Sequence, residues 1–166
     1  LTNAQPWDNL KFDEAGVDEV RRKFFGTLYN TYSFFALYAN VDGFTAHMAC
    51  DTHKDWVPVK ERPEIDRWVI SLLNTLIEKV DNAYADYDIT TAGRLIQDFV
   101  CDQLSNWYVR LNRKRFWGGE MDRQKYAAYG TNVSGPAGRR GTATDSGRCS
   151  LGTPEFHAGV RSFADR

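Results

Sequence analysis

The chain has 166 residues, of which 42% are hydrophobic and 14% aromatic, so one domain with a sizeable core is expected. Its net charge of −1 argues against bulk polyanion binding but allows a local basic patch. No apolar run approaches the roughly 20 residues of a membrane span, and no secretory signal pattern is visible. Three widely separated cysteines, Cys50, Cys101 and Cys149, favour a reducing cytoplasm over a disulfide framework.

The first predicted helix begins near Asp13 to Val17 and ends around Asn40 to Gly43. Acidic residues in its first turn suit the positive end of the helix dipole, and Gly43 can take a left-handed closing conformation. Phe25, Tyr29, Phe34 and Tyr38 widen the apolar stripe of this helix, so we expect it to be covered on more than one side. The residues of the stripe itself recur every three or four positions. These residues are Val17, Val20, Phe24, Leu28, Tyr32, Phe35 and Ala39.

A polar, irregular connection (44–61) leads to a second helix, which starts at Pro63 and ends near Tyr87. Proline is well tolerated in a first helical turn. The predicted apolar face comprises Ile65, Trp68, Leu72, Leu76, Val80, Ala83 and Tyr87.

A third helix, with Thr90 or Thr91 as its N-cap, is predicted to run to Arg115 or Trp117, where two glycines follow. Its apolar period includes Trp107, so packing is favoured for that side chain. The periodic positions are Ala92, Leu95, Ile96, Phe99, Val100, Gln103, Leu104, Trp107 and Leu111.

A fourth helix is predicted from Glu120–Asp122 through Tyr129, and the pattern breaks at Gly130. Residues 130–166 hold seven of the thirteen glycines and five arginines against three acids, a composition typical of disorder. We therefore divide the chain into a helical domain, 1–129, and a tail, 130–166, that is either disordered or a frameshifted reading. Long periodic helices without convincing strands predict an all-α, antiparallel helical bundle.

The sequence offers no catalytic or metal site. It contains no phosphate-cradling glycine loop and no G-x-S-x-G motif. Asp98 and Asp102 lie one turn apart without an accompanying Glu-x-x-His, so we read them as solvated acids. His47, Cys50 and His53 match no usual zinc spacing, and no second ligand pair lies elsewhere.

The run 104–117, LSNWYVRLNRKRFW, combines cations with aromatic rings. Cations suit phosphates and flat rings suit unstacked bases, which is the pairing that single-stranded RNA loops require. The alternative is structural, because helix C-termini favour Lys and Arg and aromatics commonly pack the core. The candidate RNA-binding residues are Arg110, Arg113, Lys114, Arg115 and Trp117.

Four stretches of the chain resemble the isoleucyl-tRNA synthetase family over roughly residues 1–129. They are PWDNLKFD (6–13), VDEVRRKFFGTLYNTYSFFALYANVDGF (17–44), ERPEIDRWVISLLNTLI (61–77) and LSNWYVRLNRKRFWGGEMD (104–122). The DRW and NWYVR sequences within them are hallmarks of that family. The resemblance places the chain at the helical anticodon-binding domain and the segment that leads into it.

The resemblance implies a cytoplasmic class I parent enzyme that attaches isoleucine to its tRNA with ATP and magnesium, neither of which this chain is expected to bind. The partners it implies are the anticodon arm of isoleucine tRNA and the remainder of the synthetase, with no membrane or DNA. Within the basic run it implies phosphate contact or helix stabilisation for the four cations and stacking for Trp117. The HIGH and KMSKS signatures are absent, so the chain alone should be inactive.

Two other functions remain open from the residues themselves. One is a freestanding RNA-binding helical module, and the other is a helical interaction protein whose basic run only closes a helix. Salt-dependent binding to an RNA hairpin separates them, because phosphate contacts weaken steeply as salt rises.

Overall fold

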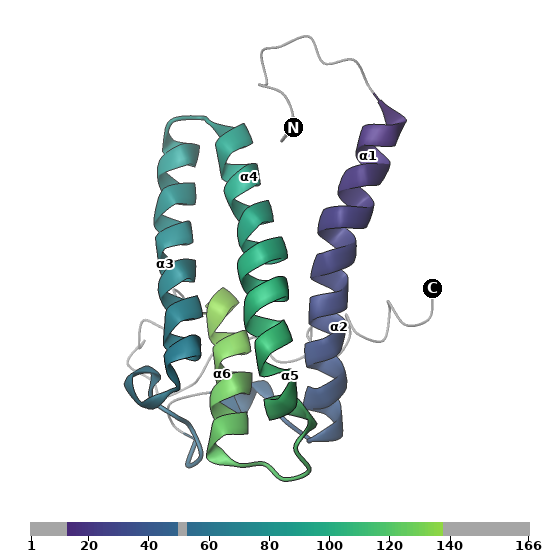
Figure 1. Cartoon of the computed structure of the whole chain (residues 1–166). Coiled ribbons are helices and arrows are strands. Elements are labelled where there is room, and N and C mark those ends of the chain that lie inside the picture. The colour runs from purple at the N-terminus through teal and green to yellow at the C-terminus, as the bar shows by residue number, and fades with distance from the viewer. Residues whose placement is uncertain (1–12, 50–52, 138–166) are drawn as a thin grey trace.

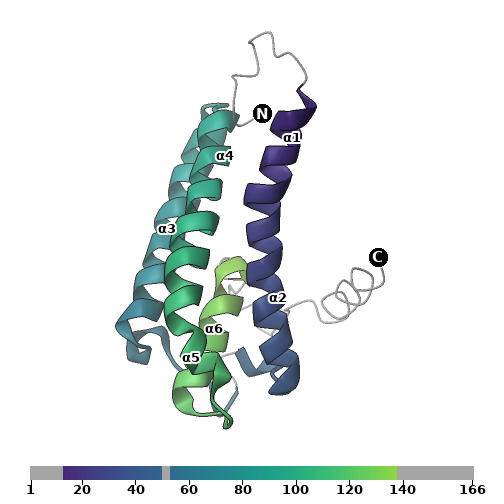
Figure 2. The same cartoon turned by 45° about the vertical axis from the view of Figure 1, so that its right-hand side comes forward.

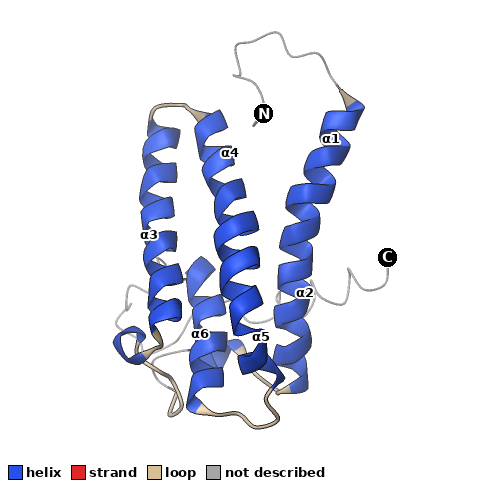
Figure 3. Cartoon of the chain, in the orientation of Figure 1, coloured by secondary structure: helices blue, strands red, loops and turns tan. Residues whose placement is uncertain are grey.

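A computed structural model describes residues 13–49 and 53–137, and every regular element in those ranges is a helix (Figures 1 and 3). This confirms the predicted all-α fold. The elements are α1 Glu14–Val20, η1 Arg21–Phe25, α2 Gly26–Val41, η2 Ala46–Ala49, η3 Val59–Glu61, α3 Glu64–Ala85, α4 Ile89–Asp98, η4 Phe99–Val109, α5 Arg110–Trp117 and α6 Arg123–Ala137.

Two long helices are each built from three consecutive elements, with a π-helical segment in the middle. They are α1–η1–α2 and α4–η4–α5, which run in the same direction, while α3 and α6 run the opposite way (Figure 1). Helix α3 packs along α4, α2 packs against η4, and α6 packs against α3 and α5. Turning the molecule shows that α1 projects away from the α3–α4 pair (Figure 2).

The helix ends follow local capping chemistry. Helix α1 begins at Glu14, within the predicted start region, and Asp13 caps it by accepting a hydrogen bond from the Ala15 N–H (3.1 Å). Gly43 takes the left-handed conformation (φ +65°), as predicted. Asp88 caps α4, with its Oδ1 atom accepting from the Thr91 N–H at 3.0 Å. The prediction of Thr90 or Thr91 as the cap is therefore wrong, because the carboxylate before them satisfies the free N–H groups first.

The apolar stripe of the first helix is covered unevenly, and most fully near its C-terminal end. Ala39 is buried and Phe24 and Phe35 are half-buried, whereas Val17 is 55% exposed. Phe34 and Tyr38 are half-buried, whereas Phe25 and Tyr29 are 57% and 51% exposed, so the expected cover on more than one side holds only for the later part of the helix among the described residues. An exposed apolar strip remains at i, i+3, i+4 and i+7 spacing: Phe25, Leu28, Tyr29 and Tyr32.

Buried positions on the long helix 89–117 recur every four residues. Trp107 and Leu111, predicted to pack, are 58% and 59% exposed. The prediction fails because it used the α-helical period of 3.6, whereas the i→i+5 bonding of η4 makes wider turns and shifts the face. The buried or half-buried series is Ala92, Ile96, Val100, Leu104, Tyr108, Asn112 and Phe116.

Helix α6 continues to Ala137, past the end predicted at Tyr129. Tertiary contacts outweigh the weak helix propensity of this stretch. The side chains of Thr131 and Asn132 donate hydrogen bonds to backbone carbonyls one turn earlier in the helix. Gly130 packs closely against Arg62, because a Cβ added at Gly130 would lie 3.2 Å from Arg62 Nη2. Residues 130–137 are thus helical, and the predicted tail from 138 onward lies outside the described residues.

The main core cluster gathers around Tyr129. Its ring stacks on Phe44 (4.7 Å between centroids) and meets Phe116 edge-on at 5.2 Å. A second cluster places Val69 of α3 against Tyr108 and Val109 of η4. Helix α6 therefore joins the C-terminal ends of α2 and α5.

None of the helices in the described ranges combines the length and apolar character that crossing a membrane requires.

We predict that the isolated chain self-associates through the strip Phe25, Leu28, Tyr29 and Tyr32, because an exposed apolar patch promotes association. Replacing Phe25 and Leu28 by serine should lower the average mass in light scattering. Leu37→Ser is the control, since Leu37 is also exposed but lies outside the strip. A wild-type chain that stays monomeric at high concentration would contradict the prediction.

Candidate nucleic-acid interface

The basic run is anchored by a buried ion pair between Arg115 of α5 and Asp66 of α3. Asp66 is fully buried, and the guanidinium meets its carboxylate with two parallel bonds, Nη1 to Oδ1 at 2.7 Å and Nη2 to Oδ2 at 2.8 Å. Such bidentate pairs fix orientation as well as charge. The pair joins helices through residues that are 49 positions apart in the sequence.

The same carboxylate also holds the buried Tyr108, whose hydroxyl donates to Asp66 Oδ1 at 2.9 Å. Arg115 Nη1 donates to the side chain of Asn112 at 2.9 Å, and Asn112 donates to the Tyr108 carbonyl at 2.7 Å. Nη2 reaches the Gln124 carbonyl at the start of α6, at 2.7 Å. One guanidinium therefore connects α3, α5 and α6.

The shifts in pKa keep Arg115 positively charged and Tyr108 protonated. Burial alone would lower the pKa of Arg115, but its hydrogen bonds and attraction to Asp66 outweigh that effect, and the pKa is raised. Burial, followed by the nearby Asp66 charge, raises the pKa of Tyr108, so its hydroxyl remains a donor. Of the two roles that the sequence left open for Arg115, the structure shows the stabilising one.

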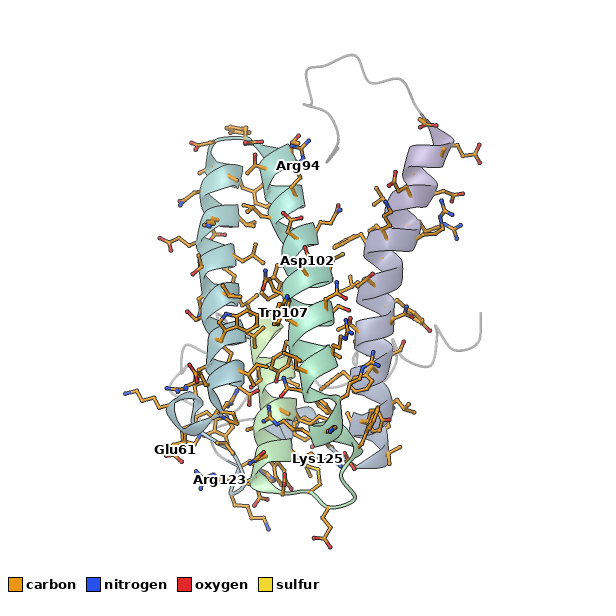
Figure 4. All side chains as sticks on the ribbon, viewed as in Figure 1. Glu61, Arg94, Asp102, Trp107, Arg123 and Lys125 are labelled. Atoms are coloured by element: carbon orange, nitrogen blue, oxygen red, sulfur yellow. The ribbon has the colours of Figure 1, made fainter. Side chains whose placement is uncertain are left out.

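With Arg115 turned inward, the remaining candidates lie on the outer side of α5. Arg110, Arg113, Lys114 and Trp117 are exposed and follow i, i+3, i+4 and i+7 spacing, which places them on one helical face. Trp107, labelled on the same long helix in Figure 4, is exposed one turn earlier. We call these five residues the basic-aromatic face. Sequence reasoning missed Trp107 as a surface residue, and the wider π turns are the reason.

The cations on this face form no ion pair with the acids that the structure describes. Among the described residues, no carboxylate lies within ion-pair distance of Arg110, Arg113 or Lys114. The Arg113 guanidinium lies 5.9 Å from the centre of the Phe34 ring, a cation–π contact that orients it toward α2. The face therefore presents positive charge that is available to an external anion.

A second buried cation holds the turn that follows Trp117. Lys125, at the lower end of the bundle in Figure 4, is 2% exposed. Its Nζ donates to Asp42 Oδ1 at 2.8 Å and to the Gly118 carbonyl at 2.5 Å, and Tyr129 donates to the same aspartate. Residue 118 is thereby fixed relative to α2, and the end of α5 with it.

The described residues show no grouping of three or more acids, histidines or cysteines that could hold a metal. Asp98 and Asp102 are exposed, as predicted for solvated acids. Cys50 lies outside the described residues, as does the side chain of His47, so the interpretation of that cluster as a polar linker stays a prediction.

We predict that Arg115→Met lowers the free energy of unfolding by about 3–5 kcal/mol, because it leaves the buried Asp66 charge unpaired. Urea unfolding measures the change. Arg110→Met, which removes an exposed cation from the same helix, is the matched control and should stay within about 0.5 kcal/mol of wild type. Equal destabilisation of the two variants would contradict a stabilising role for Arg115.

Known proteins match both this helical region and its surroundings. Residues 66–133 match the family model described as the anticodon-binding domain of tRNA ligase. The chain is 68% identical over 131 residues to isoleucine–tRNA ligase of Bacteroides thetaiotaomicron, and 62% identical over 131 residues to that of Porphyromonas gingivalis. Both alignments cover 79% of this chain and 11% of the relative.

A more distant relative gives the same result: isoleucine–tRNA ligase of Clostridium tetani is 44% identical over 130 residues, covering 78% of this chain and 12% of that protein. The chain thus spans only about 11% of the length of the first of these relatives. Residues 66–133 contain the Asp66–Arg115 pair and the whole basic-aromatic face. Residues 66–133 therefore match an anticodon-binding domain of tRNA ligases, and most of the chain is similar to one segment of isoleucine–tRNA ligases.

Proposed function

We propose that the basic-aromatic face binds the anticodon arm of an isoleucine tRNA. The observation that supports this most strongly is the separation of the cations in the basic run. Arg115 is paired with Asp66, while Arg110, Arg113 and Lys114 are exposed on one helical face between two exposed tryptophans. Exposed cations next to exposed rings suit an RNA loop, where phosphates and unstacked bases alternate.

In this proposal the chain acts as part of a cytoplasmic ligase that attaches isoleucine to tRNA using ATP and magnesium. The relatives' names and the high identity support that role. The sequence contains neither HIGH nor KMSKS, so amino-acid activation belongs to other parts of such an enzyme. The contribution of the described residues is to bind and orient the RNA.

The test is a titration of the full chain with a labelled hairpin carrying the isoleucine anticodon stem and loop, at several salt concentrations. Binding should weaken linearly on a log–log plot as salt rises, because phosphate contacts release counterions. Arg110→Ala combined with Lys114→Ala should reduce the slope by about 0.7 for each phosphate of the single-stranded loop that the variant can no longer neutralise.

The matched control is Arg67→Ala combined with Lys79→Ala, two exposed cations of α3 outside the face, which should leave the slope unchanged. A valine anticodon hairpin tests specificity. Equal binding to both hairpins would favour a general RNA-binding module. No binding at low salt by a folded sample would contradict RNA binding and favour a helical interaction protein.

A further inference from the structure

A polar groove lies beside the basic-aromatic face, between the first long helix and the second. Thr27 and Asn30 line it from α2, Asp98, Asp102 and Asn106 from the facing helix, and Arg113 from α5. Its volume is about 540 Å³, which is within the range of small-ligand sites. Figure 4 labels Asp102 on the middle helix, and Figure 1 shows α2 beside it.

The charges in this groove favour a neutral, hydrogen-bonding ligand over a phosphate. Asp98 and Asp102 lie one turn apart and would repel an anion. Among the described residues that line the groove, Lys23 is the one lysine, and its Nζ already bonds Glu19 at 2.5 Å. Arg113 is the remaining cation of the lining. A phosphate is therefore favoured near Arg113, and the interior suits groups that donate hydrogen bonds to carboxylates.

Exocyclic amines of nucleobases are such donors. Carboxylates accept from the cytosine N4 amine, and Asn side chains pair with the adenine edge in two-bond fashion. Asp98, Asp102, Asn30 and Asn106 supply both kinds of group. Uracil has no exocyclic amine, so its edge would place carbonyl oxygens against the two carboxylates.

The groove is continuous with the proposed RNA surface. Arg113 belongs to both, and Asn106 lies one turn before Arg110 on the same helix. A nucleotide whose phosphate contacts Arg113 can therefore direct its base into the groove. Resting on the proposed function, we propose that the groove binds one unpaired, amine-bearing base of the same RNA.

The experiment uses the full chain and the isoleucine anticodon hairpin, with each loop nucleotide replaced in turn by an abasic one. At one loop position, removing the base should weaken binding to the wild type about tenfold, in line with the contribution of a single bound base. Asp98→Ala combined with Asp102→Ala should shrink that effect to about twofold, since both carboxylate acceptors of the base amine are then gone.

The matched control is Glu78→Ala combined with Asp86→Ala, which removes two exposed acids, one on α3 and one just after it, that lie outside the groove. This control should leave the tenfold effect intact. At the sensitive position, a base analogue lacking the amine should reproduce much of the abasic effect. Suppose that binding depends on salt but that base removal weakens the wild type and the groove variant equally at every loop position. That result would overturn the groove proposal and leave the proposed function standing. No RNA binding by the wild type would overturn both.

Discussion

The bidentate pair between Asp66 and Arg115 is the constraint on which the rest of this structure depends. A fully buried carboxylate is costly unless its charge is paired and its oxygens are bonded, and here one guanidinium and one phenol satisfy it. Because the partners come from α3 and from the long helix 89–117, satisfying Asp66 fixes the rotation of that helix about its own axis.

That rotation decides which side chains reach the surface. With Tyr108 and Arg115 turned toward Asp66, residues 110, 113, 114 and 117 lie on the exposed side of the helix. Lys125 then fixes the turn after α5 through the Gly118 carbonyl. The exposed cations are thus displayed by a rigid, buried polar framework, which suits recognition of a ligand by preorganised charge.

The sequence predicted where the helices lie, but not which of their side chains are buried. Periodicity and the Gly43 stop located the helices, and the cluster of cations identified the candidate surface. Trp107 and Leu111 were assigned to the wrong side because an α-helical period cannot anticipate the π turns of η4. Arg115 could not be separated from its neighbours, since its partner lies in another helix. The end of α6 was misjudged because Gly130 is held by Arg62, a contact that local composition does not reveal.

The central claim is a division of labour within one basic run, with Arg115 holding the fold and its exposed neighbours meeting RNA. The most direct test measures the salt slope of hairpin binding for Arg115→Met, at a low temperature and without denaturant so that the variant stays folded. Our account predicts a wild-type slope despite the lower stability, because no phosphate-binding side chain has been removed. A slope reduced by the equivalent of one phosphate, with stability unchanged, would contradict it.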